Sequence, residues 1–229
     1  MRLAIFDIDG TLVSGASTER RFYLQLLRSG NQGPRQVLAA ACFPLRWAPV
    51  YGSQVFKKNK AYLYRLRVAK VAALASAWVR RGLTAHWYEP CLQRLRWHRE
   101  RGDRILLLSG TPQFIADQIA RLVGADAAIG SLCARDDGRF RAAPPLRHPF
   151  GDEKLRLAED WCREQGLELA SAAAYGDSRH DLPLLTRVGR PVAVRPDAEL
   201  QAAATEAGWE ILGRRSGWSM AGLLPLSRG

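Results

Sequence analysis

Cysteine and long apolar runs are both scarce in this 229-residue sequence. The four cysteines, Cys42, Cys91, Cys133 and Cys162, are widely separated and form no CxxC pair, which argues against structural zinc and favours a reducing compartment, the cytoplasm. No apolar run reaches the length of a membrane span, and the N-terminus lacks the pattern of a signal peptide. With 47% hydrophobic residues, the chain is expected to form a globular core.

Acidic residues are nearly missing from one stretch of the chain. Residues 17–104 hold 18 Lys and Arg against only four Asp and Glu, a net charge of +14, whereas the remaining residues sum to −2. Such asymmetry suits an anionic substrate, an anionic membrane surface or nucleic acid. Four tryptophans of this stretch are candidate anchors: Trp47, Trp78, Trp87 and Trp97. Solvated arginines and core tryptophans would explain the same residues, and both interpretations stay open.

Apolar runs of strand length alternate with helical patterns outside this stretch. Strands are predicted at residues 2–6, 105–108, 127–129, 172–175 and 191–194, with a hairpin turn at residues 137–138. Residues 14–103 have helical patterns instead, including one long helix over residues 55–79. This order predicts an α/β fold with a Rossmann-like, doubly wound parallel sheet. We expect residues 1–13 and 104–229 to form that core, and residues 14–103 to form an all-helical insertion with its return helix.

Polar residues follow three of the predicted strands. Asp7 and Asp9 lie two residues apart at the end of the first strand, so their side chains point to the same side. Their charges repel unless a cation or a shared proton compensates. Ser109 and Asp177 end two other strands. Because ligands of open α/β sheets bind beyond the carboxyl ends of the strands, these four side chains are expected on one rim.

The segment after Ser109 is predicted to turn directly into a helix. Thr111 fits the capping position and Pro112 the first helical position. The backbone N–H groups that follow Ser109, including that of Gly110, would then be free to hold an anion.

Lys154 stands in an unfavourable local position. If Asp152 caps its helix, Lys154 falls in the first turn, where the helix dipole disfavours a cation. A position of Lys154 beside the carboxylate of Asp7 would explain why a lysine stands in this turn. Carboxylates, a lysine and a hydroxyl around one point, with oxygen atoms as ligands, predict Mg²⁺ rather than zinc. They also predict phosphoryl transfer in which a carboxylate attacks phosphorus.

Four segments, in this order, resemble the motifs of the haloacid dehalogenase superfamily of phosphohydrolases. They are Phe6-Asp-Ile-Asp-Gly-Thr-Leu12, Leu108-Ser-Gly110, Lys154 and Gly176-Asp-Ser-Arg-His-Asp181. The helical insertion between the first two is similar to the C1-type cap of that superfamily. Residues 174–185, 188–197 and 208–209 are similar to its phosphoserine-phosphatase-like IB subfamily. The resemblance covers residues 1–13 and about 88–212.

The resemblance implies a role for each matching residue. Asp7 would be the nucleophile that forms an aspartyl-phosphate, and Asp9 would be the general acid and base. The carboxylates of Asp7 and Asp177 and the backbone carbonyl of Asp9 would hold Mg²⁺, with Asp181 in support. The phosphate of the substrate would be bound by Ser109, Gly110 and Lys154. Thr11 would be a supporting residue.

The resemblance also implies a small phosphorylated metabolite as the substrate, such as phosphoserine, histidinol phosphate or a similar amino-alcohol phosphate. Phosphoserine enzymes carry a cap glutamate about nine residues after the nucleophile, where this chain has Ala16, and Glu19 stands three residues later. The candidate arginines for an anionic substrate are Arg20, Arg21, Arg65 and Arg67. No obligate nucleic-acid partner is expected. Two alternatives stay open, a phosphomutase of the same fold and a basic insertion that docks on an anionic membrane or nucleic acid.

Overall fold

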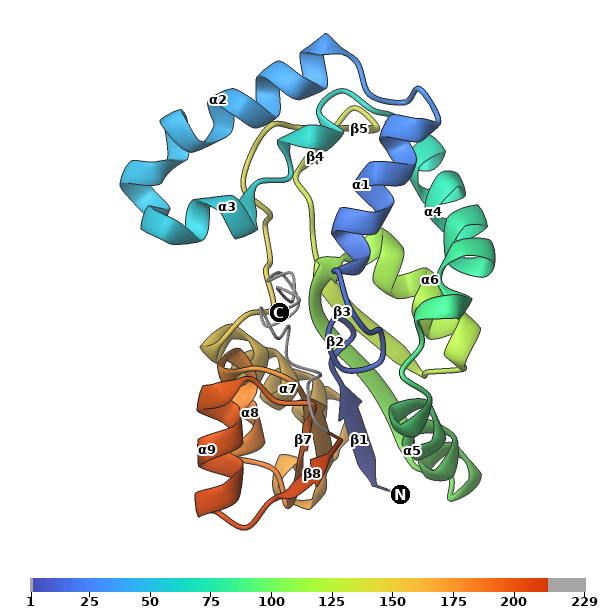
Figure 1. Ribbon diagram of the computed structural model, residues 1–229, viewed down its shortest axis with the longest axis vertical. Helices are drawn as coiled ribbons and strands as arrows, with labels where there is room; N and C mark the ends of the chain where they lie inside the picture. Colours follow the sequence, from blue (N-terminus) through green and yellow to red (C-terminus); the bar gives the residue numbers. More distant parts are fainter. Residues whose placement is uncertain (1, 214–229) are drawn as a thin grey trace, which may run out of the picture.

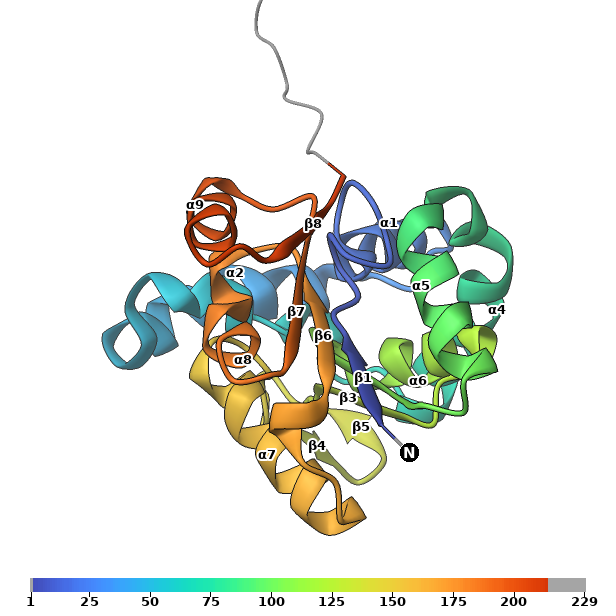
Figure 2. The ribbon, with the colours of Figure 1, turned by 90° about the horizontal axis from the view of Figure 1, so that it is seen from below.

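The chain forms a parallel sheet with helices on both faces (Figure 1, Figure 2). We describe it from a computed structural model that defines residues 2–213, so residues 214–229 of the expected core lie outside the described part. All neighbouring strands of the six-stranded sheet run parallel. The predicted doubly wound α/β fold is therefore confirmed.

The sheet has the strand order β3-β2-β1-β6-β7-β8, and β4 and β5 form a separate hairpin. The strands are β1 (Leu3–Phe6), β2 (Arg104–Pro112), β3 (Ala127–Ser131), β4 (Arg135–Asp136), β5 (Arg139–Phe140), β6 (Ala173–Gly176), β7 (Arg190–Val194) and β8 (Glu210–Leu212). The α-helices are α1 (Thr18–Arg28), α2 (Pro34–Tyr51), α3 (Val55–Lys58), α4 (Val68–Gly82), α5 (Glu89–Glu100), α6 (Gln113–Val123), α7 (Asp152–Gln165), α8 (Leu182–Leu185) and α9 (Ala198–Glu206). The hairpin turns at residues 137–138, as predicted.

Alternate residues of the central strand β1 face opposite helical layers. Leu3 and Ile5 join a buried cluster with residues of α7, α8 and α9, whereas Phe6 joins a second cluster with residues of α1, α4, α5 and α6. Figure 2 shows these two layers on either side of the sheet. The rings of Phe22 on α1 and Phe114 on α6 lie 5.6 Å apart, so the first helix of residues 14–103 shares a core with the sheet. The proposed domain boundaries stay a prediction.

The predicted long helix over residues 55–79 is wrong. Helices α3 and α4 are separate, with a short turn at Ala61–Leu63 between them. Arg65 has a left-handed φ of 62°, and its N–H donates to the carbonyl of Phe140 at 2.9 Å. The N–H of Val68 donates to the carbonyl of Gly138, also at 2.9 Å. Backbone pairing with the hairpin therefore replaces the helical hydrogen bonds in this segment.

Two predicted helix caps are also wrong. Strand β2 continues through Pro112, which pairs with Ser131 of β3 beyond an irregularity in the register, so Thr111 does not cap α6. Gly151 rather than Asp152 is the N-cap of α7, and its φ of 58° suits glycine. Asp152 is the first helical residue, where its negative charge still complements the helix dipole.

Candidate active site

A pocket of about 510 Å³ lies at the carboxyl ends of three parallel strands. Asp7 follows β1, Ser109 lies in β2 and Asp177 follows β6, so the sheet brings these side chains to one edge. At the ends of these strands and on α7, the residues that line the pocket include Asp7, Asp9, Ser109, Gly110, Lys154 and Asp177. The lining residues contributed by α1 with its N-cap residue, by α3 and by the following turn include Ser17, Glu19, Arg20, Tyr23, Phe56, Lys57, Lys60 and Tyr62.

Lys154 is buried between two carboxylates. Its Nζ donates to Asp7 Oδ1 at 2.8 Å and to Asp181 Oδ1 at 2.5 Å. Burial opposes its charge, but Asp181 and Asp7 outweigh burial and raise the pKa of Lys154 above its ordinary value. These two contacts account for a lysine in the first turn of α7, despite the helix dipole.

Asp7, Asp177 and Asp181 form a buried acidic group. One carboxylate oxygen of each lies within 4.8 Å of the other two. The pKa of Asp7 is raised from 3.8 to about 7, mainly by burial and in part by Asp181 and Asp177, and Lys154 offsets only some of this effect. Carboxylate oxygens gathered this closely are hard donors, and such donors suit a hard divalent cation such as Mg²⁺.

The two residues after Asp9 are closely enclosed. Gly10 has a φ of 89°, and a Cβ at this position would lie 2.1 Å from Asp177 Oδ2, so the loop after β1 requires glycine to approach that carboxylate. Thr11 is fully buried, and its hydroxyl has no hydrogen-bond partner among residues 2–213.

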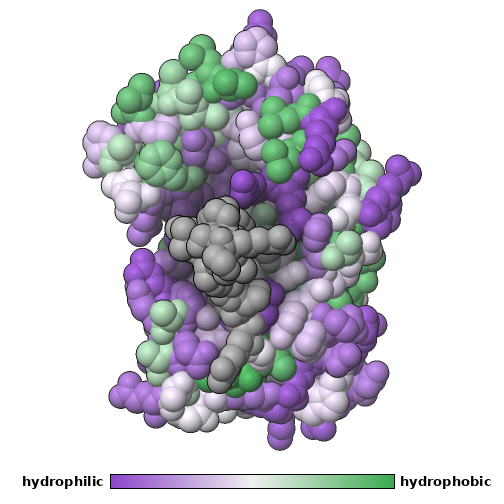
Figure 3. Space-filling view, viewed as in Figure 1, coloured by the Kyte–Doolittle hydropathy of each residue, from purple (hydrophilic) through white to green (hydrophobic). Residues whose placement is uncertain are grey.

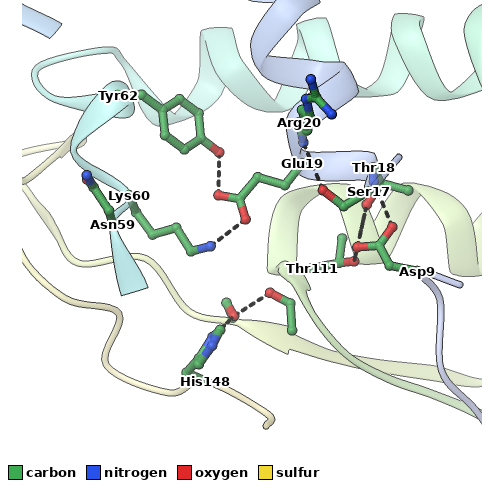
Figure 4. A network of polar contacts seen from close by, with 12 residues as sticks. Asp9, Ser17, Thr18, Glu19, Arg20, Asn59, Lys60, Tyr62, Thr111 and His148 are labelled. Atoms are coloured by element: carbon green, nitrogen blue, oxygen red, sulfur yellow. Dashed lines mark hydrogen bonds and ion pairs between the residues drawn. The ribbon is translucent and has the colours of Figure 1, made fainter. Parts of the chain in front are cut away.

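Asp9 makes its hydrogen bonds at the start of α1 (Figure 4). Its Oδ1 accepts from the N–H of Thr18 at 2.7 Å, and its Oδ2 accepts from the hydroxyls of Thr111 and Thr18 at 2.9 and 3.2 Å. Burial raises the pKa of Asp9, and these hydrogen bonds only partly offset that effect. Neither threonine stood out as a site residue in the sequence, since the fold brings Thr111 to Asp9 across 102 residues.

Ser109 and Gly110 lie in an extended segment rather than at a helix start. Ser109 Oγ accepts from the N–H of Thr111 at 3.3 Å, and the carbonyl of Gly110 accepts from the hydroxyl of Ser131 at 2.7 Å. Both residues line the pocket. The N–H groups that follow Ser109 therefore belong to β2 and not to the start of α6, and their binding of an anion stays a prediction.

A charged cluster on α1 and the turn after α3 also lines the pocket (Figure 4). The Nζ of Lys60 contacts Glu19 Oε2, and the hydroxyl of Tyr62 donates to Glu19 Oε1 at 2.9 Å. Lys60 is 2% exposed, and Glu19 is the carboxylate that pairs with it there. Glu19 is therefore a glutamate that lines the pocket, although it stands three residues after Ala16, the position expected for the cap glutamate. No motif in the sequence marks Lys60 or Tyr62 as a residue of the site.

Only one of the four candidate arginines, Arg20, lines this pocket. Arg21 Nε donates to the carbonyl of Ala16 at 2.9 Å. Arg65 lines a second cavity beside the hairpin, and Arg67 pairs through its backbone with Arg139 of β5.

Known proteins match most of this chain. The family model for haloacid dehalogenase-like hydrolases matches residues 4–186. A phosphoserine phosphatase of Mycobacterium tuberculosis is 31% identical over 216 residues, which cover 91% of this chain and 69% of that protein. A histidinol-phosphatase of Neisseria meningitidis is 28% identical over 224 residues, which cover 92% and 97%. The crystal structure of a Bordetella pertussis protein of unknown function has a TM-score of 0.77 at 26% identity, covering 93% of this chain and 98% of that one. The chain therefore belongs to the haloacid dehalogenase-like family of hydrolases.

Proposed function

We propose that the protein is a Mg²⁺-dependent phosphatase that hydrolyses a small phosphomonoester through an aspartyl-phosphate on Asp7. The observation that carries this proposal is the different setting of two neighbouring aspartates. Asp7 is paired with Lys154 inside an acidic group, whereas Asp9 is held by the hydroxyl and backbone donors of two threonines. A nucleophile and a proton donor need such different environments.

The reaction has two steps. First, a carboxylate oxygen of Asp7 attacks phosphorus, the bond from phosphorus to the ester oxygen breaks, and Asp9 gives its proton to the leaving oxygen. The raised pKa of Asp9 suits a group that begins protonated. Second, Asp9 takes a proton from water as the water oxygen attacks the phosphorus, which releases inorganic phosphate and Asp7. Lys154 and Ser109 hold the phosphoryl oxygens while negative charge develops on them.

The buried acidic group is the proposed magnesium site. Asp7 and Asp177 would hold the ion together with the backbone carbonyl of Asp9. Asp181 would support them, because it binds Lys154 and accepts from the N–H of Asp177 at 3.1 Å. When bound, Mg²⁺ supplies positive charge that offsets Asp7 and the phosphoryl oxygens.

Hydrolysis of p-nitrophenyl phosphate tests this function. We expect phosphate release in Mg²⁺ without any second substrate, a loss of ~100-fold or more on chelation, and recovery when Mg²⁺ is added back. A phosphomutase would instead need an acceptor hydroxyl before the phosphoryl group leaves the enzyme. Phosphate release that is unchanged by chelation would contradict the metal site, and no release in Mg²⁺ would contradict the phosphatase itself.

For the substrate, we propose an amino-acid-like or amino-alcohol phosphate. Phosphoserine and histidinol phosphate, which the names of the two relatives indicate, both carry an amino group. Glu19 lines the same pocket as Asp7 and Asp177 and accepts hydrogen bonds from Lys60 and Tyr62. A substrate ammonium group could join these donors at the same carboxylate.

Glu19→Gln is the test of this substrate class. We expect kcat/KM for amino-bearing phosphomonoesters to fall by ~10-fold or more, because a hydrogen bond to a charged group is lost. The control substrate is glycerol phosphate, which has no amino group and should lose little. Equal losses for both substrates would argue against amine recognition, and thermal unfolding checks that Lys60 tolerates the loss of its counter-charge.

A further inference from the structure

Helix α2 exposes an apolar face where a surface helix ordinarily presents polar residues. Val37, Leu38, Ala41, Leu45 and Ala48 are all exposed, and at 100° per residue they fall within an arc of about 100°. We call these five residues the α2 face. Leu38 is 65% and Leu45 is 83% exposed. In Figure 3, hydrophobic residues gather at the upper left, where Figure 1 shows α2.

The α2 face is not needed to hold the helix on the protein. The opposite side of α2 carries Phe43, which is buried with Val55 of α3 and Ala61. Trp47 and Tyr51 pack against the same cluster. The helix therefore has its own buried contacts, and the α2 face remains as surplus apolar surface.

Positive charge borders the α2 face. Arg35 and Arg46 are exposed and lie about 60° and 80° around the helix from Leu38, on one side of the face, with the guanidinium of Arg46 over the ring of Trp47. Residues 20–88 contain no Asp or Glu at all. On the adjoining helix α3, Phe56 is 71% exposed and is followed by Lys57 and Lys58. An apolar stripe with a cationic border is the pattern of a helix that lies in the interface of an anionic bilayer.

Exposed apolar side chains are concentrated in this part of the molecule. Ten large hydrophobic side chains are exposed among the described residues, and seven of them lie between residues 24 and 56. Within residues 2–213, none of the helices combines the length and the apolar character that crossing a bilayer requires. A lipid contact would therefore be peripheral.

We propose that the α2 face docks on the surface of an anionic lipid bilayer, with its leucines in the headgroup and acyl boundary and its arginines on lipid phosphates. Three of the four tryptophans expected as anchors are packed, since Trp78 and Trp87 lie against the main core and Trp47 packs behind α2. The fourth, Trp97, is 37% exposed but lies on α5, outside the α2 face. Nucleic acid is the less suitable partner, because the most exposed groups are aliphatic and offer nothing to a phosphate backbone. This docking is independent of the proposed phosphatase chemistry.

Sedimentation of the full chain with vesicles tests the proposal. We expect binding to phosphatidylcholine vesicles with about 30% phosphatidylglycerol, and little binding to phosphatidylcholine alone. Leu38→Glu with Leu45→Glu should weaken binding by ~10-fold or more. The matched control is Leu122→Glu on α6, another exposed leucine, which should bind as the unchanged protein does.

A second pair of variants tests the cationic border. Arg35→Glu with Arg46→Glu should abolish the preference for anionic vesicles, whereas Arg121→Glu on α6 should keep it. Circular dichroism and thermal unfolding verify that each variant folds. The proposal is overturned if the unchanged protein does not bind anionic vesicles, or if Leu38→Glu with Leu45→Glu binds them as tightly as the unchanged protein does. It is also overturned if these substitutions reduce only the binding of DNA or the self-association of the protein in vesicle-free solution.

Discussion

Asp7→Asn should reduce the hydrolysis of p-nitrophenyl phosphate by ~10⁴-fold or more, because the amide cannot form the aspartyl-phosphate. The substitution keeps the size of the side chain in a position that is 7% exposed. Its measurement is kcat in saturating Mg²⁺, with Asp9→Asn as a comparison that removes the proposed proton donor but leaves the proposed nucleophile. Activity retained in Asp7→Asn would exclude Asp7 as the nucleophile.

The same variant has a second readout that does not depend on activity. Since burial raises the pKa of Asp7 from 3.8 to about 7, the folded state holds this proton to higher pH than the unfolded state does. Ionisation of Asp7 therefore costs stability as pH rises through that window in metal-free protein. We expect the Tm of Asp7→Asn relative to the unchanged protein to increase by ~4 °C or more between about pH 5 and pH 8. A difference that does not vary with pH would contradict the raised pKa.

Lys154→Met should damage both stability and activity. It leaves Asp7 and Asp181 buried without their shared cation, and breaking a buried ion pair in this way costs about 3–5 kcal/mol. We also expect kcat to fall by ~10²–10³-fold, because the phosphoryl oxygens lose a positive donor. Urea unfolding and phosphate release in Mg²⁺ measure the two effects separately.

Lys154→Arg is the matched control for that substitution, because it retains the charge. It should recover most of the stability and part of the activity, since the larger guanidinium must fit a site built for an ammonium group. If Lys154→Met unfolds at the same urea concentration as the unchanged protein, the ion pairs with Asp7 and Asp181 are not stabilising.

The sheet and the acidic rim could be predicted because their signals are local. The run Leu3–Phe6 is apolar at every position, as a strand covered on both faces must be, and Asp7 follows it directly. Lys154 was informative because it contradicts a local preference, and its ion pairs with Asp7 and Asp181 supply the reason.

The missed features all depend on contacts between distant segments. Arg65 adopts a left-handed φ because its neighbourhood pairs with the hairpin, and no glycine or proline marks that break. Lys60 meets Glu19 across 41 residues. Thr111 has the residue type of a helix cap, but β2 runs past it and its hydroxyl binds Asp9 instead. In each case the tertiary partner outweighs the local pattern.

The separate packing of α2 and α3 has a consequence for how substrate enters. Outward movement of α1 would expose Phe22 and break its packing on α6, whereas α2 and α3 rest on a small cluster that centres on Phe43 and Val55. Figure 1 shows this pair of helices projecting away from the sheet. Because Phe56 and Lys57 of α3 also line the pocket, displacement of this pair would open the pocket and leave the packing of Phe22 on α6 intact. A surface that binds α2 would then change the rate at which substrate enters the pocket, because it would hold α2 and α3 either in place or displaced.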